Sequence, residues 1–208
     1  MIRNVIFDLG NVLISFSPSD YLEKNKYPEN KRKAILADIF RSQEWLLLDN
    51  GDISPERAIE SIAGRSSLSR QEIALILDKR TDIMFPLADN VKIVPELKKQ
   101  GFRLYYLSNF PADIFPEVKR SYSFFKYFDG GLISAEVRCS KPGSRIFEIL
   151  IEKYGLVPQE CLYVDDLEIN VKSAETIGFI GFCTEGSPGI GEEIQNLLRN
   201  QTPVSEIR

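Results

Sequence analysis

Short apolar runs alternate with amphipathic stretches along most of this chain. The runs rich in β-branched and aromatic residues, a composition that favours strands, are Ile2–Asp8, Phe102–Ser108, Gly131–Ser134, Cys161–Asp165 and Phe179–Thr184. The stretches with apolar residues at helical spacing are Asn90–Lys99, Ala112–Tyr122, Ser144–Tyr154, Leu167–Ile177 and Ile190–Arg199. Strands and helices that alternate in this way predict βαβ units, and therefore an α/β domain with a doubly wound, mostly parallel sheet.

The interval from residue 15 to residue 88 departs from this alternation. It contains no convincing strand, but it shows helical patterns at Asp20–Lys26, Glu29–Phe40, Ser54–Ala63 and Ser69–Met84. We therefore expect a small α-helical cap at 15–88, inserted after the first strand of a core domain that consists of 1–14 and 89–200. Residues 201–208 are expected to form a frayed tail.

The composition is that of an ordinary globular protein and excludes several classes of function. The 208 residues carry a net charge of −4, and the densest basic cluster, Lys31–Lys33, is typical of a solvated helix face, so we expect no nucleic-acid partner. The chain contains no histidine, which excludes Ser-His-Asp catalysis and histidine-ligated zinc. Acid–base or metal chemistry must therefore use carboxylates, lysine, tyrosine or thiols.

The expected location is the cytoplasm. No apolar run approaches the length of a transmembrane helix, and the chain begins with a strand rather than a signal peptide. The cysteines, Cys139, Cys161 and Cys183, are far apart and lack CxxC spacing, which favours a reducing compartment. We expect no membrane contact and no obligate protein partner.

Residues with reactive or ligand-binding side chains follow the predicted strands. They are Asp8, Ser108 with Asn109, Lys141 in a loop before a predicted helix, and Asp165 with Asp166. Taken alone, each has an ordinary explanation as a turn, a loop pair or a solvated acidic pair. The carboxyl ends of the strands in an open α/β sheet share one edge, where ligands bind, so we expect these side chains to converge on one cleft.

The residue types in this predicted cleft indicate phosphoryl chemistry. Carboxylates that gather from two strands favour a divalent cation, and oxygen ligands without histidine or cysteine favour Mg²⁺ over zinc. A hydroxyl, an amide and an ammonium suit a bound phosphate. Asp8 could then attack phosphorus as a nucleophile and form an aspartyl-phosphate, because the metal and Lys141 would neutralise the oxygens that otherwise repel it.

The same elements resemble the four motifs of the haloacid dehalogenase-like hydrolase superfamily. In chain order they are VIFDLGNVL, LSN, SKPGSRIFEIL and YVDDLEINVKSAETIGF, and the resemblance spans Ile2 to about Thr184. It implies a Rossmann-like core with a helical cap, and a Mg²⁺-dependent phosphatase that acts on a small phosphorylated metabolite.

The resemblance also implies a role for each residue. Asp8 would be the nucleophile, Ser108 and Asn109 would hold the transferring phosphoryl group, and Lys141 would neutralise nucleophile and phosphate. Asp166, supported by Asp165, would complete the Mg²⁺ site with Asp8 and the Gly10 carbonyl. Asn170 would orient the carboxylate loop.

Gly10 departs from the pattern of the family's phosphatases, which carry a second acid at this position. Three consequences follow as alternatives: substrates with better leaving groups, such as sugar 1-phosphates; a replacement acid from the cap or solvent; or a catalytically weak phosphometabolite-binding protein. A 2-haloacid dehalogenase is the rival enzyme class, because that branch also lacks the second acid. The retained Asp165–Asp166 pair favours phosphoryl chemistry.

The cap sequence narrows the resemblance further. FDLGNV, together with Trp45 and the segment Asp49–Ser54, most resembles small phosphatases of the α-D-glucose-1-phosphate phosphatase type. Phe16, Trp45 and the loop Asp49–Asp52 are candidates to face the cleft. In the alternative interpretation, the aromatic residues belong to the core of the cap and the acids cap a turn.

Overall fold

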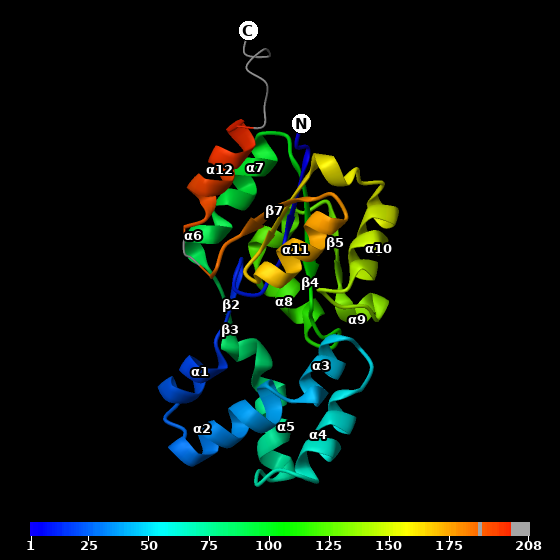
Figure 1. The fold of residues 1–208 in the computed structure, drawn as a ribbon. Helices are drawn as coiled ribbons and strands as arrows, with labels where there is room; N and C mark the ends of the chain where they lie inside the picture. Colours follow the sequence, from blue (N-terminus) through cyan, green and yellow to red (C-terminus); the bar gives the residue numbers. More distant parts are fainter. Residues whose placement is uncertain (187–188, 201–208) are drawn as a thin grey trace.

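The computed structural model describes residues 1–186 and 189–200, and a five-stranded sheet forms its centre (Figure 1). In space the strands follow the order β5 (Gly130–Ile133), β4 (Arg103–Ser108), β1 (Asn4–Phe7), β6 (Cys161–Asp165) and β7 (Ile180–Cys183). All neighbouring strands are parallel. The α/β class and the parallel sheet are therefore confirmed. The tail expected at 201–208 lies outside the described residues.

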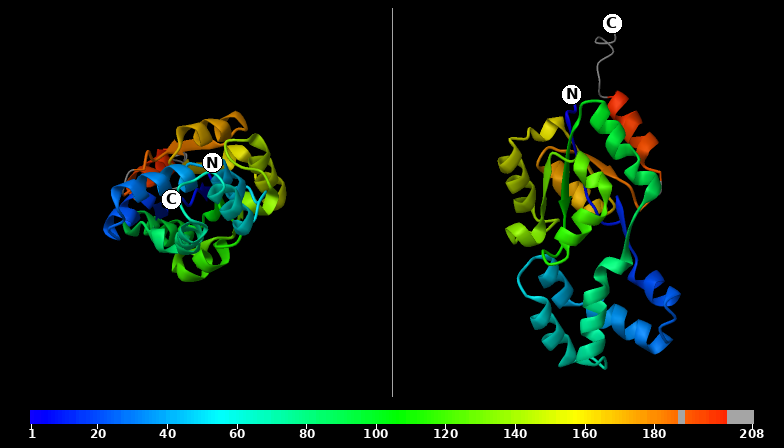
Figure 2. Two further views of the ribbon diagram at one scale, coloured as in Figure 1. Left: turned by 90° about the horizontal axis from the view of Figure 1, so that it is seen from below. Right: turned by 180° about the vertical axis from the view of Figure 1, so that it is seen from behind.

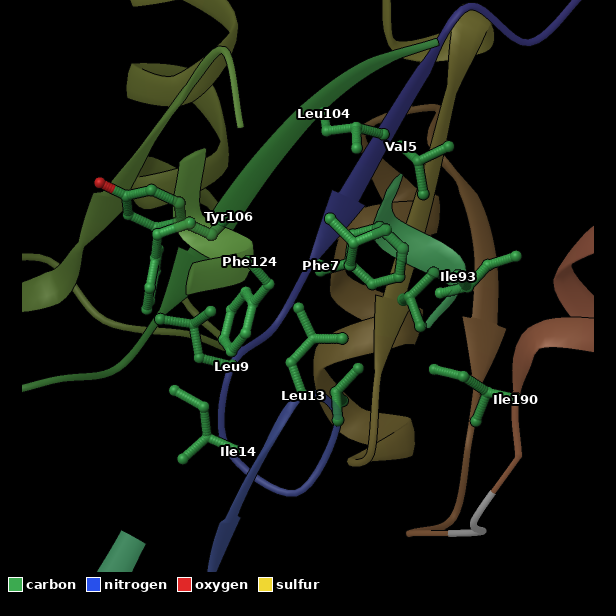
Figure 3. Close-up of a cluster of buried hydrophobic side chains, with 14 of the residues drawn as sticks. Val5, Phe7, Leu9, Leu13, Ile14, Ile93, Leu104, Tyr106, Phe124 and Ile190 are labelled. Atoms are coloured by element: carbon green, nitrogen blue, oxygen red, sulfur yellow. The ribbon is translucent and has the colours of Figure 1, made fainter. Parts of the chain in front are cut away.

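Both faces of the sheet are buried. Alternate side chains of each strand point to opposite faces, and apolar side chains occupy both. Val5 and Phe7 of β1 pack into one apolar cluster, whereas Ile6 packs into another. Figure 3 shows the first cluster, in which Phe7 lies among side chains from other elements, including Leu13 and Ile93. A slip of one residue would exchange the two sets, so burial on both faces fixes the register of the sheet.

Helices cover both faces. The face of the first cluster carries α7 (Ile93–Lys99), α8 (Phe115–Ser121) and α12 (Gly191–Asn200). The other face carries α10 (Ser144–Tyr154) and α11 (Glu168–Thr176). The remaining short elements are α6 (Ala88–Val91), α9 (Ser134–Val137) and the 3₁₀ turns Ser123–Tyr127 and Pro158–Glu160. Within residues 1–186 and 189–200, no helix is both long and apolar enough to span a bilayer.

A separate apolar core lies in the helical cap, which Figure 1 shows below the sheet and Figure 2 shows from behind. The cap helices are α1 (Pro18–Lys24), α2 (Glu29–Ile35), α3 (Gln43–Asp49), α4 (Pro55–Ala63) and α5 (Arg70–Asp78). Serine side chains begin three of them: Ser42, Ser54 and Ser69 each accept a hydrogen bond from the backbone N–H three residues further on. These caps satisfy N–H groups that have no partner within the helix.

Some cap helices differ from the sequence prediction. The helix expected at Ser69–Met84 ends at Asp78 and continues as a 3₁₀ turn at Lys79–Ile83. The helix expected at Glu29–Phe40 changes to a π-helix at Leu36–Phe40. Helix α3 was not predicted, because its uninterrupted apolar run at 45–48 hides the helical period.

The two segments that connect the core and the cap pair as a small antiparallel sheet, so the expectation of no strand at 15–88 is wrong. Strand β2 (Ile14–Phe16) lies beside β3 (Met84–Pro86), with Ser15 opposite Phe85. Three residues are too few to show a period of two, and the proline in β3 argues against a strand. The domain bounds that we propose, after residues 14 and 88, lie within β2 and just beyond β3.

Asn90 of α6 joins two distant segments of the core. Its side chain is buried; Nδ2 donates a hydrogen bond to the Val12 carbonyl at 2.8 Å, and Oδ1 accepts one from the Gly189 N–H at 2.7 Å. Val12 lies between β1 and β2, whereas Gly189 precedes α12. The amide therefore helps to hold the chain where it leaves the core for the cap.

We expect Asn90→Ala to lower the free energy of unfolding by about 1–3 kcal/mol, because the buried Val12 carbonyl loses its donor and the Gly189 N–H loses its acceptor. Urea unfolding followed by circular dichroism measures the change. Asn30→Ala, at an exposed position of α2, is the matched control and should shift the free energy by less than about 0.5 kcal/mol. Equal shifts in the two variants would contradict this role of Asn90.

Candidate active site

Three neighbouring strands bring polar side chains to the carboxyl edge of the sheet. Asp8 directly follows β1, Ser108 is the last residue of β4, and Asp165 is the last residue of β6. Because β1 lies between β4 and β6, these side chains meet around the central strand. All three are buried, and Asp8 retains an exposed fraction of 7%.

Lys141 reaches this cluster from the loop between α9 and α10. Its Nζ lies 2.9 Å from Asp8 Oδ1 and 2.6 Å from Asp165 Oδ2. Asn109 holds the loop, because its Nδ2 donates a hydrogen bond to the Lys141 carbonyl oxygen at 3.0 Å and its Oδ1 accepts one from the Lys141 backbone N–H at 2.9 Å. The amide of Asn109 therefore positions the lysine.

Asp165 accepts hydrogen bonds on both carboxylate oxygens. The Tyr163 hydroxyl and Lys141 Nζ donate to Oδ2, and the Leu167 backbone N–H donates to Oδ1 at 2.9 Å. Asn170 Nδ2 lies 3.0 Å from Oδ1 and 3.2 Å from Oδ2. These donors use the full accepting capacity of the carboxylate, so in this structure Asp165 holds Lys141.

The neighbouring Asp166 completes an acidic cluster. One carboxylate oxygen each from Asp8, Asp165 and Asp166 lies within 4.8 Å of the others, and Asn11 Nδ2 donates to Asp166 Oδ2 at 3.3 Å. A single ammonium, that of Lys141, does not balance three carboxylates. Because all the candidate ligand atoms are oxygens, the donor set fits a hard divalent cation such as Mg²⁺.

Burial and charge shift the pKa values in this cluster. Burial raises the pKa of Asp8 to about 6, against the opposing effect of the Lys141 ammonium. Burial alone would lower the pKa of Lys141, but the carboxylates of Asp8 and Asp165 outweigh it and raise that pKa. Burial, together with the charge of Asp165, raises the pKa of Asp166. A cation at this position would favour the ionised forms of Asp8 and Asp166.

A cavity of about 240 Å³ opens beside the acidic cluster, between core and cap. The core supplies Asp8, Gly10, Asn11, Ser108, Asn109, Phe110, Pro111, Asp166 and Leu167. The cap and its connecting strands supply Ile14, Phe16, Trp45, Asp49 and Met84. Lys141 and Asp165 are not among these lining residues. Of the acidic pair, Asp166 is therefore the member that reaches the cavity.

The cap side of the cavity is mostly apolar. Phe16 of β2 stacks on Trp45 of α3 with ring centroids 5.5 Å apart, and Phe40 packs against Trp45 at 4.9 Å. Phe16 and Trp45 line the cavity and also pack in the core of the cap. These aromatic residues therefore both face the cleft and belong to the cap core. In the loop 49–52, Asp49 lines the cavity and residues 50–52 do not.

The chain matches a known hydrolase family. A sequence profile of the haloacid dehalogenase-like hydrolases matches residues 2–178, which is most of the chain. The protein belongs to this family, and the predicted superfamily and enzyme class are confirmed. The closer assignment to the α-D-glucose-1-phosphate phosphatase type stays a prediction.

The chain is similar over nearly its whole length to individual proteins of the family. It is 26% identical to the sesquiterpene phosphatase astK of Aspergillus oryzae, over 94% of this chain and 96% of that protein. A predicted HAD-like family hydrolase from Porphyromonas gingivalis has a TM-score of 0.72 at 26% identity, covering 97% of this chain and 100% of that one. The HAD family enzyme bt-2542 of Bacteroides thetaiotaomicron, in complex with magnesium and inorganic phosphate, has a TM-score of 0.68 at 24% identity, covering 88% and 94%.

Two residues around the acidic pair were not predicted from the sequence. Tyr163 precedes Asp165 by two positions on the same face of β6, and the period of two could have indicated their contact. Asn11 has a left-handed backbone with φ of 51°, and its side chain connects Asp166 to the Phe16 backbone N–H, which donates to Asn11 Oδ1 at 3.1 Å. The Gly-Asn pair after the strand was the available signal for this turn.

We expect Lys141→Met to lower the free energy of unfolding by roughly 3–5 kcal/mol, because two buried carboxylates lose their counter-charge. Urea unfolding in the presence of EDTA measures this change without a contribution from bound metal. Lys99→Met, at an exposed position in the last turn of α7, is the control and should have little effect. If both variants unfold alike, the buried ion pairs do not stabilise the fold.

Proposed function

We propose that this hydrolase is a Mg²⁺-dependent phosphatase that converts a small phosphorylated metabolite through an aspartyl-phosphate intermediate on Asp8. The main observation in support is the position of Asp8 on the cavity wall, with Lys141 Nζ 2.9 Å from its Oδ1. The ammonium favours an ionised nucleophile and reduces its repulsion from phosphate oxygens. The similar bt-2542 enzyme, solved with magnesium and inorganic phosphate, supports this class of ligand.

The proposed metal site uses the acids on the cavity side. Asp8, Asp166 and the Gly10 carbonyl would hold Mg²⁺, which supplies positive charge to the phosphate oxygens when bound. Asp165 was predicted as a fourth member of this site. Because its oxygens already accept hydrogen bonds from four groups, we assign it the supporting role of fixing Lys141 beside the site.

The phosphoryl group would transfer twice. An Asp8 oxygen attacks phosphorus while the bond to the leaving oxygen breaks, and water then attacks the aspartyl-phosphate to release phosphate and Asp8. Ser108 and Asn109 line the cavity at this position, and the Ser108 hydroxyl and the Asn109 backbone N–H would hold the phosphoryl group, because the Asn109 side-chain amide is bonded to the Lys141 backbone. Lys141, predicted both to act in catalysis and to bind substrate, would act from behind through its contact with Asp8.

Asp8→Asn should reduce phosphate release from every substrate to background, because an amide oxygen does not form the phosphoryl intermediate. Inorganic phosphate release from a panel of phosphate esters measures the loss, and EDTA should have the same effect on the unaltered protein. Asp20→Asn, an exposed acid of α1, is the control and should retain full activity. Phosphate release that persists in Asp8→Asn protein would remove Asp8 from this role.

Two rival functions predict different results in the same assays. A 2-haloacid dehalogenase would release halide from 2-chloropropionate, and EDTA would not affect the rate. A catalytically weak phosphometabolite-binding protein would show thermal shifts with phosphate esters but no turnover. The position of Asp166 on the cavity wall beside Asp8 favours the phosphatase, because a dehalogenase does not need a second acid for a metal.

The cavity wall bears on the substrate. A sugar 1-phosphate is the substrate that the sequence favours, because its leaving group requires less help from an acid. The side-chain amides of Asn11 and Asn109, however, already bind protein groups, and Phe16, Trp45 and Met84 form an apolar wall. This wall favours a second candidate, a phosphate monoester with an apolar body, which the resemblance to the sesquiterpene phosphatase astK supports.

The cytoplasmic location and the absence of nucleic-acid, membrane and obligate protein partners stay predictions.

If the apolar wall binds the substrate, geranyl monophosphate should have a higher kcat/KM than glucose 1-phosphate. Phe16→Ser should then raise the KM for geranyl monophosphate about tenfold, since an aromatic contact of roughly 1.5 kcal/mol is lost, and leave the KM for acetyl phosphate unchanged. Phe85→Ser, at an exposed position of β3 outside the cavity, is the matched control. A higher kcat/KM for the sugar, with no effect of Phe16→Ser, would favour the sugar 1-phosphate.

A further inference from the structure

The position that would carry a second acid next to the nucleophile is empty. A Cβ atom built on Gly10 would meet Asp8 Oδ2 at 3.9 Å, which is ordinary van der Waals contact, and the structure shows nothing nearer to it among the described residues beyond its chain neighbours. Among the described residues, no side chain from another segment fills the space beside Gly10. A side chain that protonates the leaving oxygen would therefore lie elsewhere on the cavity wall.

Asp49 is the remaining titratable side chain on that wall. Of the described residues that line the cavity, only Asp8, Asp49 and Asp166 carry groups that exchange protons near neutral pH. Asp8 is the proposed nucleophile and Asp166 the proposed metal ligand. Asp49, the last residue of α3, lies on the cap side of the cavity, where the body of a substrate held at Asp8 would extend.

Contacts with the core hold Asp49 in this place. The Ser134 hydroxyl, at the start of α9, donates a hydrogen bond to the Asp49 carbonyl oxygen and accepts one from the Phe110 backbone N–H at 2.9 Å. Gly51 has a left-handed φ of 73°, and a Cβ there would lie 2.7 Å from the Ala135 carbonyl oxygen. The end of α3 thus rests directly on α9, the helix that precedes the Lys141 loop.

We propose that Asp49 is the general acid and base of the reaction and replaces the acid that is absent at Gly10. This inference rests on the proposed phosphatase function. In the first step, the Asp49 carboxyl would give its proton to the leaving oxygen as Asp8 bonds to phosphorus. In the second step, the Asp49 carboxylate would take a proton from the water that attacks the aspartyl-phosphate. The cycle returns both side chains to their starting state and releases alcohol and phosphate.

The groups around Asp49 suit an acid that works near neutral pH. Burial raises the pKa of Asp49 to about 7, while the charge of Arg80 and a hydrogen bond with the Trp45 side chain lower it and the charge of Asp113 raises it. Arg80 is itself paired with Asp113, and Nη1 and Oδ1 lie 3.4 Å apart. A carboxyl group with a pKa near the working pH exchanges protons efficiently in both directions.

The test compares Asp49→Asn with the unaltered enzyme in a single turnover with Mg²⁺. An alkyl phosphate needs a proton on its leaving oxygen, whereas p-nitrophenyl phosphate does not. Asp49→Asn should slow the release of alcohol from the alkyl ester in the first turnover about 10²–10⁴-fold and the release of p-nitrophenol less than tenfold. Hydrolysis of the aspartyl-phosphate, which uses Asp49 as the base, should slow by the same factor with both esters. The decline in the alkyl rate of the unaltered enzyme as the pH rises through about 7 should be absent from the variant. Asp52→Asn, which neutralises an exposed acid of the same loop outside the cavity, should match the unaltered enzyme.

A second variant supplies the missing acid at its usual position. The double variant Gly10→Asp/Asp49→Asn should release alcohol from the alkyl ester at least tenfold faster than Asp49→Asn alone, because position 10 has room for a side chain. Equal slowing of alcohol and p-nitrophenol release, or no slowing of either, would overturn the role of Asp49 as the acid and leave the phosphatase function unaffected. An unaltered enzyme that releases no phosphate from either ester would overturn the proposed function itself, and this inference with it.

Discussion

The buried contact of one ammonium with two carboxylates is the interaction on which the site depends. Lys141 lies between Asp8 and Asp165, and the cost of removing three charges from water is offset only while all three stay together. Their positions come from two adjacent strands and one distant loop. The hydrogen bonds of Asn109 to that loop and of Tyr163 to Asp165 therefore serve the same end, because both keep the ammonium against its partners.

The cap is attached in a way that separates its packing from that of the sheet. It has its own apolar core, and its two connections to the sheet domain run as one antiparallel pair, β2 with β3. The Ser134 contact and the close approach of Gly51 to Ala135 place the end of α3 against the core. Side chains on this face of the cap can therefore change the cavity wall without disturbing the buried charges below it.

The sequence predicted those parts of the site that local rules determine. Asp8 and Ser108 stand where apolar runs end, and the rule that ligands bind at the carboxyl edge of a parallel sheet brings such residues together. Strands β2 and β3 could not be predicted, because each has three residues and is stable only through the other. A supporting role for Asp165 was expected from the family resemblance, but its contact with the Lys141 ammonium could not be predicted, because it depends on the tertiary structure.

Because position 10 is a glycine, the core and the cap would each supply a different part of the proposed chemistry. The core holds the nucleophile and the charges that stabilise phosphorus, whereas the remaining proton-exchanging group on the described cavity wall, Asp49, belongs to the cap. Trp45 and Asp49 are four residues apart and so lie on one face of α3. A substrate body that packs on Trp45 would bring its leaving oxygen toward Asp49. Recognition of the body and protonation of the leaving group would then depend on the same helix, so binding energy away from phosphorus would accelerate the chemical step.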